Sequence, residues 1–470
     1  MLRTTSKLFQ LLTLFLLLIS AAAFSPAVSA QEDQPQAPVY RVEEGDYLLG
    51  IALKFGVSID DLAAANGISD YSQISVGTDL IIPGLPGVTG RLATIEIPIG
   101  ENLASLSRQY RIPKEELARM NRLVSPMQAY RGKDLIVTEN AASDMLSGRV
   151  SLLEGESLLE AAARSGDNPW MLGALNQEVQ FWELTPGETL ISATSTNTGP
   201  GALPTSIRTI ALKPERITQG STVVLDLQTD DTAQLNGFLG DWSLHFFQNG
   251  IEETALQGVL AVADPGFYPL SLQGTQADGT AFDFSQWVYI GDGGYPFDPP
   301  LTVNASLIDP AVTEPENEQV RAITERFSQE KLWQGQFVFP VAPVFSDCFT
   351  SRFGNRRSYN GSDYDFYHTG LDFCGAVGDD VYSTAAGEVV FTGPLTVRGN
   401  TTIIDHGWGV FTVYMHQSEI FVNKGDRVEK GQLIGYVGGT GRVEGPHLHW
   451  EVWAGGIPVD PINWLQNEYP

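Results

Sequence analysis

The chain has 470 residues, with 28 Lys and Arg against 56 Asp and Glu, and a formal net charge of −28. This charge opposes binding to phosphate backbones and to anionic lipid surfaces, so we expect no nucleic-acid partner. At about 100–200 residues per domain, the length predicts a multidomain protein and excludes a small disulfide scaffold. Frequent Gly (48) and Pro (27) favour folded, β-rich modules with many turns.

Residues 1–30 have the features of a secretory signal peptide. Two basic residues precede an apolar run, and Val28-Ser29-Ala30 supplies small side chains for cleavage. We expect a secreted or cell-envelope protein whose mature chain begins near Gln31 and has no later transmembrane span. An uncleaved N-terminal anchor is the alternative interpretation.

A period of 55 residues runs through the first part of the chain. It is marked by Gly45, Gly100 and Gly155, by Asn66, Asn121 and Asn176, and by Gly77, Gly132 and Gly187. In the first copy, two short helical runs lie between two segments of strand character. The sequence therefore predicts a βααβ unit that is present three times.

The first copy, residues 39–84, runs from Tyr40-Arg41-Val42-Glu43-Glu44-Gly45-Asp46 through Asn66-Gly67 to Leu80-Ile81-Ile82-Pro83, and it resembles a LysM module. The resemblance implies binding to glycans that contain N-acetylglucosamine, such as peptidoglycan. Residues 94–138 and 149–192 are similar to degenerate LysM modules, because Glu101 replaces Asp46 in the second copy and Ser165 replaces Phe55 in the third. These two copies either bind glycan or act as spacers.

The middle of the chain carries no recognisable chemistry. Residues 193–205 have the composition of a linker. Residues 206–295 are expected to form a β-sandwich-like domain, with candidate strands at Thr222–Leu227, Trp242–Phe247, Tyr268–Leu272 and Phe282–Ile290. A capping box at Thr313-x-x-Glu316 then predicts a bridging helix over 313–333.

Five of the six histidines are concentrated near the C-terminus: His368, His406, His416, His447 and His449. His368-x-x-x-Asp372 supplies an imidazole and a carboxylate, and the spacing of His447 and His449 places both imidazoles on one face of a strand. Two His and one carboxylate leave a tetrahedral zinc ion one open position for water, which is typical of a catalytic site. The spacing alone does not decide whether His447 or His449 is the ligand.

The C-terminal domain, residues 337–470, contains a series of motifs in a fixed order. They are Ser351-Arg352-Phe353-Gly354, His368-Thr369-Gly370-Leu371-Asp372, Ala386-Gly387-Glu388-Val389-Val390, Tyr414-x-His416, Lys430-Gly431-Gln432-Leu433-Ile434-Gly435 and Gly445-Pro446-His447-Leu448-His449-Trp450-Glu451. With these motifs, residues 349–465 resemble the lysostaphin-type (LytM-type) zinc metallo-endopeptidases, which hydrolyse peptidoglycan cross-bridges or stem peptides.

The resemblance implies an antiparallel β-sheet with a groove over a zinc ion. It implies that His368, Asp372 and His449 bind zinc and that His416 and His447 are catalytic residues beside the attacking water. Arg442-Val443-Glu444 stands where relatives usually have a small hydroxyl pair, which leaves the cleaved bond open. For His406, in a predicted turn, we expect a structural role.

The two cysteines of the chain, Cys348 and Cys374, are expected to pair because an exported chain meets an oxidising environment. Cys374 lies two residues after Asp372, so the disulfide would brace the metal site. Two alternatives are an extra zinc ligand, which would close the position that catalysis needs for water, and two free thiols.

The sequence thus predicts a multidomain, mainly β protein: LysM-like βααβ repeats, a β-sandwich-like middle domain and a C-terminal zinc peptidase domain. The leading hypothesis is a secreted zinc endopeptidase that cleaves peptide bonds in peptidoglycan and is targeted to wall glycan by its LysM modules. The alternatives are a non-catalytic wall-binding or hydrolase-activating protein and a zinc protease that acts on peptides outside the wall.

Overall fold

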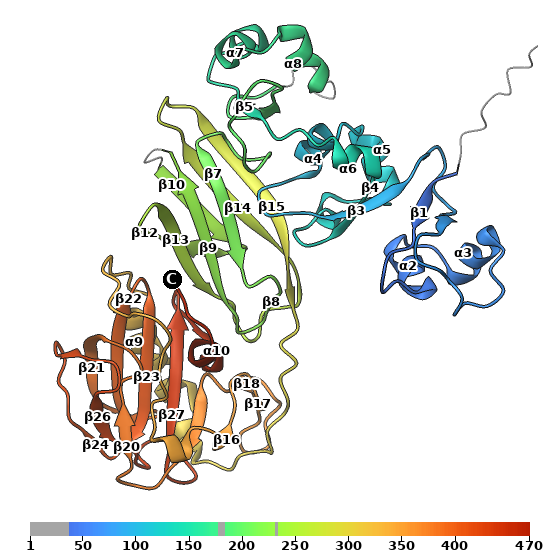
Figure 1. Cartoon of the computed structure of the whole chain (residues 1–470). Helices are drawn as coiled ribbons and strands as arrows, with labels where there is room; N and C mark the ends of the chain where they lie inside the picture. The colour runs from blue at the N-terminus through green and yellow to red at the C-terminus, as the bar shows by residue number, and fades with distance from the viewer. Residues whose placement is uncertain (1–36, 177–183, 231–233) are drawn as a thin grey trace, which may run out of the picture. The chain divides into compact units, whose positions relative to one another are not determined.

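The computed structural model describes residues 37–176, 184–230 and 234–470 (Figure 1). The predicted signal peptide, residues 1–30, lies outside these ranges. The chain divides into two compact units, Met1–Leu92 and Ala93–Pro470, and each is considered by itself. Within the described ranges, no helix combines the length and the apolar character that crossing a bilayer requires.

The first unit contains one βααβ module. Its elements are β1 (Val39–Arg41), α2 (Leu48–Lys54), α3 (Ile59–Asn66) and β2 (Asp79–Ile81), and β1 pairs antiparallel with β2. Helix α3 begins where Ser58 Oγ accepts a hydrogen bond from the amide of Asp61 at 3.0 Å. It ends at Gly67, whose φ of 64° is a conformation that glycine adopts without strain.

The second unit begins with two more modules of the same kind. Their elements are β3 (Leu92–Glu96), α4 (Leu103–Tyr110), α5 (Lys114–Met120), the 3-10 turn η1 (Pro126–Gln128), β4 (Asp134–Thr138), α6 (Glu139–Ser143), β5 (Arg149–Ser151), α7 (Leu158–Ser165), α8 (Pro169–Leu175) and β6 (Thr189–Ile191). Strand β3 pairs with β4, and β5 pairs with β6. The predicted threefold βααβ repeat is confirmed.

The repeated asparagine has the same structural role in every module. Asn66 Nδ2 donates to the carbonyls of Leu62 and Ile81, both at 2.8 Å, and its Oδ1 accepts from the Ile81 amide at 2.7 Å. Asn121 and Asn176 make the equivalent three bonds. Each side chain thus ties the end of the second helix to the closing strand, which explains the 55-residue spacing of this residue type.

The segment predicted to be a linker, residues 193–205, wraps around a buried arginine. Arg149 is 1% exposed, and its Nη1 donates to the carbonyls of Pro200 at 2.6 Å and Leu203 at 3.1 Å. Its Nε donates to Asn197 Oδ1 at 2.9 Å. The composition of the segment gave no sign of this anchoring, because it depends on a side chain more than 45 residues earlier.

The middle of the second unit is a two-sheet β-sandwich, as predicted (Figure 1). One sheet has the order β11-β10-β14-β15-β8 and the other the order β12-β13-β9-β7. The strands are β7 (Ile207–Lys213), β8 (Ile217–Thr218), β9 (Thr222–Thr229), β10 (Gln234–Leu239), β11 (Trp242–Leu244), β12 (Phe246–Asn249), β13 (Glu252–Gly258), β14 (Gly266–Thr275) and β15 (Ala281–Gly291). Alternate residues of β15, such as Phe282, Phe284 and Val288, point into the core between the sheets.

The bridging helix differs from its prediction over 313–333. Helix α9 spans Pro310–Thr324, and its N-cap is Asp309, whose Oδ1 accepts from the amide of Ala311 at 2.9 Å. Pro310 occupies the first helical position, where a backbone N–H would have no acceptor within the helix. Proline has no N–H, so it favours the start of the helix at this residue. Glu316 closes no capping box; its carboxylate accepts from the amides of Val397 at 2.8 Å and Arg398 at 3.1 Å.

The C-terminal part is built on an antiparallel sheet with the order β16-β19-β27-β23-β22-β21-β25, extended by β28 on β27 (Figure 1). The strands are β16 (Phe349–Ser351), β19 (Leu371–Cys374), β21 (Gly387–Leu395), β22 (Gly399–Gly407), β23 (Val410–Gln417), β25 (Arg427–Val428), β27 (His447–Ala454) and β28 (Ile457–Val459). Smaller elements are η2 (Ala305–Leu307), η3 (Pro343–Phe345), β17 (Arg356–Arg357), β18 (Phe366–Tyr367), β20 (Asp380–Tyr382), β24 (Glu419–Ile420), β26 (Leu433–Tyr436) and α10 (Pro461–Gln466).

The two faces of this sheet are both covered. One face buries Leu371, Phe373, Leu448, Trp450 and Val452 in the main core. The other face carries Val413, Met415 and Trp453, which pack with Val320 and Ile323 of α9. The site described next lies at the end of this second face, where polar side chains replace apolar ones.

Candidate metal centre

Three buried side chains meet at one point of the C-terminal sheet. Asp372 of β19 lies directly opposite His449 of β27 in the antiparallel register, and His368 precedes β19 by three residues. Asp372 Oδ1 is 2.9 Å from His368 Nε2 and 2.7 Å from His449 Nδ1, and these two nitrogens are 2.9 Å apart. The two motifs that the sequence placed 77 residues apart thus form one cluster.

The outer nitrogens of both rings fix the tautomers. His368 Nδ1 is 2.9 Å from the carbonyl oxygen of Arg352, which only accepts, so Nδ1 carries the proton and Nε2 presents a lone pair. His449 Nε2 lies 3.0 Å from Glu451 Oε1, and His449 holds the pKa of Glu451 at about 2 despite its burial. This carboxylate is ionised, so Nε2 donates and the lone pair of neutral His449 lies on Nδ1.

The cluster therefore directs three electron-pair donors at one point, and such an arrangement attracts a cation. Burial favours the protonated form of Asp372, yet His368 and His449 hold its pKa well below the ordinary range. Burial lowers the pKa of His449, but Asp372 and Glu451 raise it above its ordinary value. Two imidazoles and one carboxylate, with the outer N–H groups bonded to oxygen, are a donor set that fits a divalent metal ion.

Two residues outside this triplet orient it, and the sequence analysis gave neither a role. Arg357 Nη2 donates to Asp372 Oδ2 at 2.9 Å, which leaves Oδ1 for the cluster. Glu451 also accepts from Thr369 Oγ1 and, at 2.7 Å, from Trp453 Nε1. The signal for Glu451 was present, because a residue two positions after His449 on a strand shares its face. No spacing rule points to Arg357.

The two histidines expected beside the water lie next to the cluster. The rings of His416 and His447 are 4.9 Å apart, and His416 is 6.1 Å from His449 between ring centroids. His447 Nε2 lies 3.6 Å from Asp372 Oδ1. Each Nδ1 donates to a carbonyl, His416 to Thr440 at 2.8 Å and His447 to Gly445 at 2.9 Å, so both Nε2 atoms carry lone pairs when the rings are neutral.

His416 reaches this side of the sheet through an unusual backbone conformation. Its neighbour Met415 pairs with His449, so strict alternation would turn His416 to the opposite face. A φ of 61° interrupts the extended backbone at His416, a left-handed conformation that costs energy for a residue with a Cβ. Burial, together with His447 and His449, lowers the pKa of His416 to about 3, so the ring is neutral at pH 7.

His406 lies apart from the cluster, in agreement with the structural role expected for it, but it stands on strand β22 and not in the predicted turn. It is fully buried on β22, where Nδ1 donates to the carbonyl of Ala386 at 2.8 Å and Nε2 accepts from Thr412 Oγ1 at 2.7 Å. Burial lowers its pKa to about 4.

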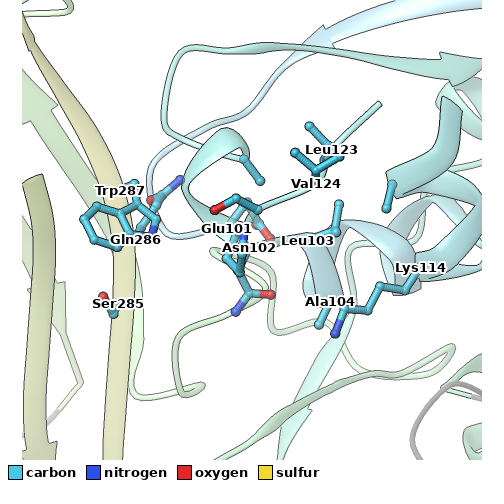
Figure 2. Close-up of a pocket in the computed structure, with 14 residues that line it drawn as sticks. Glu101, Asn102, Leu103, Ala104, Lys114, Leu123, Val124, Ser285, Gln286 and Trp287 are labelled. Atoms are coloured by element: carbon cyan, nitrogen blue, oxygen red, sulfur yellow. The ribbon is translucent and has the colours of Figure 1, made fainter. Parts of the chain in front are cut away.

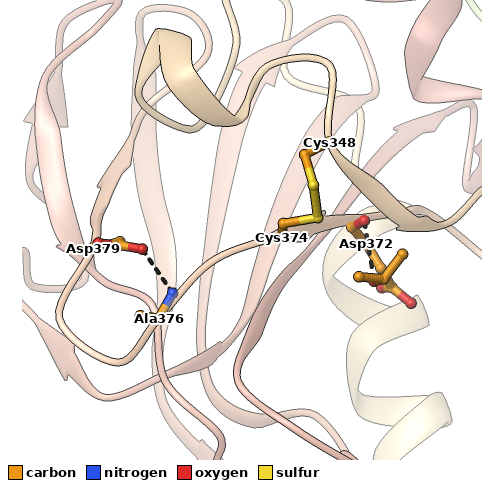
Figure 3. The surroundings of a disulfide bond; sticks show 6 residues. Cys348, Asp372, Cys374, Ala376 and Asp379 are labelled. Atoms are coloured by element: carbon orange, nitrogen blue, oxygen red, sulfur yellow. Dashed lines mark hydrogen bonds between the residues drawn. A yellow bond between two sulfur atoms is a disulfide. The ribbon is translucent and has the colours of Figure 1, made fainter.

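A disulfide closes the strand pair next to Asp372. Cys348 and Cys374 are bonded, as predicted, with their Cα atoms 5.5 Å apart (Figure 3). The Cys374 amide also donates to the carbonyl of Cys348 at 3.0 Å. Because β16 pairs with β19 on the other side from β27, the disulfide fixes the outer edge of the strand that carries Asp372.

Comparisons with known proteins give matches to two kinds of domain in this chain. Residues 366–461 match peptidase family M23, and residues 40–83 and 97–138 match the LysM domain. The chain is 42% identical over 128 residues to peptidoglycan DD-endopeptidase ShyA of Vibrio cholerae, which covers 27% of this chain and 30% of the relative. It is 36% identical over 133 residues to the DD-carboxypeptidase/endopeptidase Mpg of Neisseria meningitidis serogroup B, covering 28% of this chain and 30% of the relative.

The chain therefore matches about three tenths of the length of these curated relatives. Among solved structures, a zinc-containing peptidase from Vibrio cholerae aligns with 92% of this chain and 99% of its own, at 16% identity and a TM-score of 0.28. The protein carries a C-terminal M23 peptidase domain, which contains the cluster, and LysM domains near its N-terminus.

The geometry predicts different metal contents for two groups of variants. His449→Ala and Asp372→Ala each remove a donor atom from the cluster and should abolish stable metal binding. His416→Ala and His447→Ala remove neighbouring rings and should retain most of the metal. Elemental analysis of the four purified proteins checks this, and an unchanged metal content in His449→Ala would contradict the assignment.

Loss of the disulfide should lower both stability and metal retention. Joining residues 26 apart stabilises the fold by about 3.5 kcal/mol in the chain-entropy model. Thermal unfolding of the Cys348→Ala/Cys374→Ala double variant, compared with the oxidised and the reduced wild type, measures the effect. Since the chain has no other cysteine, reductant should reproduce the variant. Equal unfolding temperature and metal content in all three samples would show that the bond braces nothing.

Proposed function

We propose that this protein is a zinc-dependent endopeptidase that hydrolyses peptide bonds of peptidoglycan outside the cytoplasm. The observation that carries the proposal is the convergence of His368 Nε2, Asp372 Oδ1 and His449 Nδ1, with two further imidazoles beside them. The M23 match and the peptidoglycan DD-endopeptidase relatives support peptidoglycan as the substrate. The relatives' names make bonds of the DD type the first candidates.

His368, Asp372 and His449 would hold zinc. When bound, zinc supplies a Lewis acid for the scissile carbonyl and makes water at its open position more acidic. The tautomers fixed by Arg352 and Glu451 keep the two imidazole lone pairs directed at the ion without rearrangement. The hydrogen bond from Arg357 to Asp372 Oδ2 keeps the carboxylate in place during turnover.

In the proposed reaction, His416 and His447 accept and donate the proton. A neutral His416, held by Thr440, presents Nε2 as an acceptor that orients the attacking water. His447, which is more exposed at 16%, is placed to stabilise the developing oxyanion or to return the proton to the leaving amine. The outer nitrogen of His416 is bonded to a carbonyl and not to a carboxylate, and a pKa of about 3 keeps this ring neutral at pH 7.

The second LysM module has a pocket suited to a sugar. Its volume is about 430 Å³, within the size range of small-molecule sites. Figure 2 shows Asn102 and Leu103 at the start of α4 and the loop residues Leu123 and Val124 on one side, with Trp287 of β15 across from them. Apolar walls, an indole ring and amide groups suit the C–H faces and hydroxyl edges of a neutral sugar.

The partner proposed for the LysM modules is therefore wall glycan, which would hold the peptidase near its peptide substrate. The presence of all five site side chains argues against a non-catalytic wall-binding protein. A peptidase that acts on peptides outside the wall makes a different prediction in the assay below, because it would leave peptidoglycan intact.

The activity test is digestion of purified peptidoglycan by the zinc-loaded protein. Mass spectrometry should find peptides with new amino and carboxyl ends, and the products should vanish with His416→Ala. An assay on unrelated peptides is the control. Intact peptidoglycan with cleaved control peptides would contradict the wall substrate, and no cleavage of either would contradict the enzyme.

The pocket predicts a second, separate result. In the inactive His416→Ala background, beginning at residue 93 so that the first module is absent, Trp287→Ala should weaken co-sedimentation with peptidoglycan several-fold by removing one wall of the pocket. Phe238→Ala is the matched control, since this aromatic ring is 37% exposed on β10 of the sandwich and does not line the pocket. Equal retention by both variants would contradict a sugar site here.

A further inference from the structure

The segment between the sandwich and α9 runs beside the metal centre as an added strand. Phe297 and Leu301 form parallel bridges with Arg356 and Tyr359. The amide of Asp298 donates to the carbonyl of Arg356 at 2.9 Å, and the Leu301 amide donates to the carbonyl of Ser358 at 2.9 Å. Residues 296–303, called the arm here, therefore belong structurally to the peptidase site, although they precede the M23 match by more than 60 residues.

The arm places one carboxylate among residues that surround the cluster. Asp298 Oδ1 accepts from Asn355 Nδ2 at 2.6 Å, and Oδ2 accepts from Ser351 Oγ at 2.9 Å. Its backbone carbonyl accepts from the hydroxyl of Tyr364 at 3.0 Å. Ser351 lies opposite Asp372 in the pairing of β16 with β19, so Asp298 also holds the strand next to the ligand strand.

Asp298 reaches the cluster through Arg357. Arg357 Nε lies 3.4 Å from Asp298 Oδ2, and Arg357 Nη2 donates to Asp372 Oδ2 at 2.9 Å. The side chains of all three are largely buried, with exposures of 17% for Asp298, 14% for Arg357 and 8% for Asp372. Within such a site these ion pairs are little screened by solvent.

The charges explain why a second carboxylate is needed. Asp372 faces Arg357 with one oxygen and the cluster with the other. Without Asp298, the buried guanidinium would keep Tyr359 and the carboxylate of Asp372 as partners, and that carboxylate would be drawn toward Arg357 and away from a metal ion. Asp298 at Nε and Asp372 at Nη2 hold the planar guanidinium of Arg357 at two edges. Nη2 then fixes Oδ2 of Asp372 and leaves Oδ1 of Asp372 directed at the ion.

We propose that Asp298, supplied by the arm from outside the matched peptidase segment, is a positioning residue of the metal site that acts through Arg357 on Asp372. The proposal rests on the metal site of the proposed function and adds that the working centre includes residues from 296 onward. A chain cut at 337, the start predicted for the peptidase domain, would lack this carboxylate.

The test measures metal binding by the full-length protein, without any substrate. Asp298→Asn keeps the size of the side chain and removes its charge. Zinc affinity, measured by competition with a chromophoric chelator, should fall about tenfold or more, as is usual when an outer partner of a metal ligand is lost. The absorption spectrum of the cobalt-substituted protein should change, because the Asp372 oxygen moves. Asp298→Glu keeps the charge and should retain more affinity than the Asn variant. If the Asn variant does not fold, Asp298→Ala takes its place, and a wild-type zinc affinity and cobalt spectrum in it would overturn the proposal.

A control and a double-mutant cycle separate positioning from general stability. Asp292→Asn is the matched control, since Asp292 caps the nearby turn at Gly294 and is not a partner of Arg357. In an Arg357→Gln background, Asp298→Asn should cause little further loss of zinc affinity, because the two residues act in series. Wild-type zinc affinity and cobalt spectrum in Asp298→Asn, or fully additive losses in the cycle, would overturn the proposal.

The two proposals fail in different ways. Wild-type protein that binds zinc but leaves peptidoglycan intact would contradict the proposed substrate and leave the role of Asp298 standing. Wild-type protein that binds no zinc would contradict the role of Asp298 as well, since there would be no metal ligand to position.

Discussion

The structure of the C-terminal domain depends on an electrostatic constraint: two imidazole nitrogens and one carboxylate oxygen are held within 3 Å of one another. In a buried site this arrangement is unfavourable unless a cation lies between the donors. The antiparallel register that sets Asp372 opposite His449 brings these donors together. The Arg352 carbonyl and Glu451 hold the two rings in the tautomers that direct their lone pairs at one point. The fold thus favours a positive charge between the three donors, and a divalent metal ion supplies that charge.

Several parts of the second unit hold the residues of this cluster in place. The disulfide fixes the outer edge of β19, and α9 covers the sheet face that leads to the site and binds the β21–β22 turn through Glu316. The His416 amide donates to the carbonyl of Arg398 in the same turn. The Glu316 carboxylate therefore connects the helix to the turn, and a backbone hydrogen bond connects the turn to His416, which explains how a left-handed residue is kept in place at the end of β23.

Periodicity and spacing predicted a large share of this structure. The repeated asparagine identified three modules because each copy uses the same three hydrogen bonds. The spacing of the histidine motifs indicated a metal site, but the choice of His449 over His447 came from the family resemblance. The disulfide followed from the compartment and from the position of Cys374. Periodicity and spacing succeeded where the same contacts repeat in each module or where the residues lie along one strand.

Other features were beyond such rules because their causes are distant in sequence. Arg357 and Asp298 are ordinary charged residues until the fold brings Arg357 beside Asp372 and Asp298 beside Arg357. Arg149 turned a linker-like segment into an anchored one through contacts with residues such as Pro200, 51 positions later. The start of α9 is a different case, because its N-cap Asp309 and Pro310 are local signals that stand before the predicted capping box. The turn of His416 toward the cluster depends on a backbone conformation that its sequence neighbours do not signal.

The most direct test of the account is a crystal structure of the zinc-loaded protein with anomalous data at the zinc edge. The account predicts one strong peak in the C-terminal domain, bonded to His368 Nε2, Asp372 Oδ1 and His449 Nδ1 at about 2.0–2.2 Å, with His416 and His447 beside it and not bonded. A peak at other donor atoms, or no peak at this cluster after loading, would contradict the claim that the converging lone pairs form a metal site.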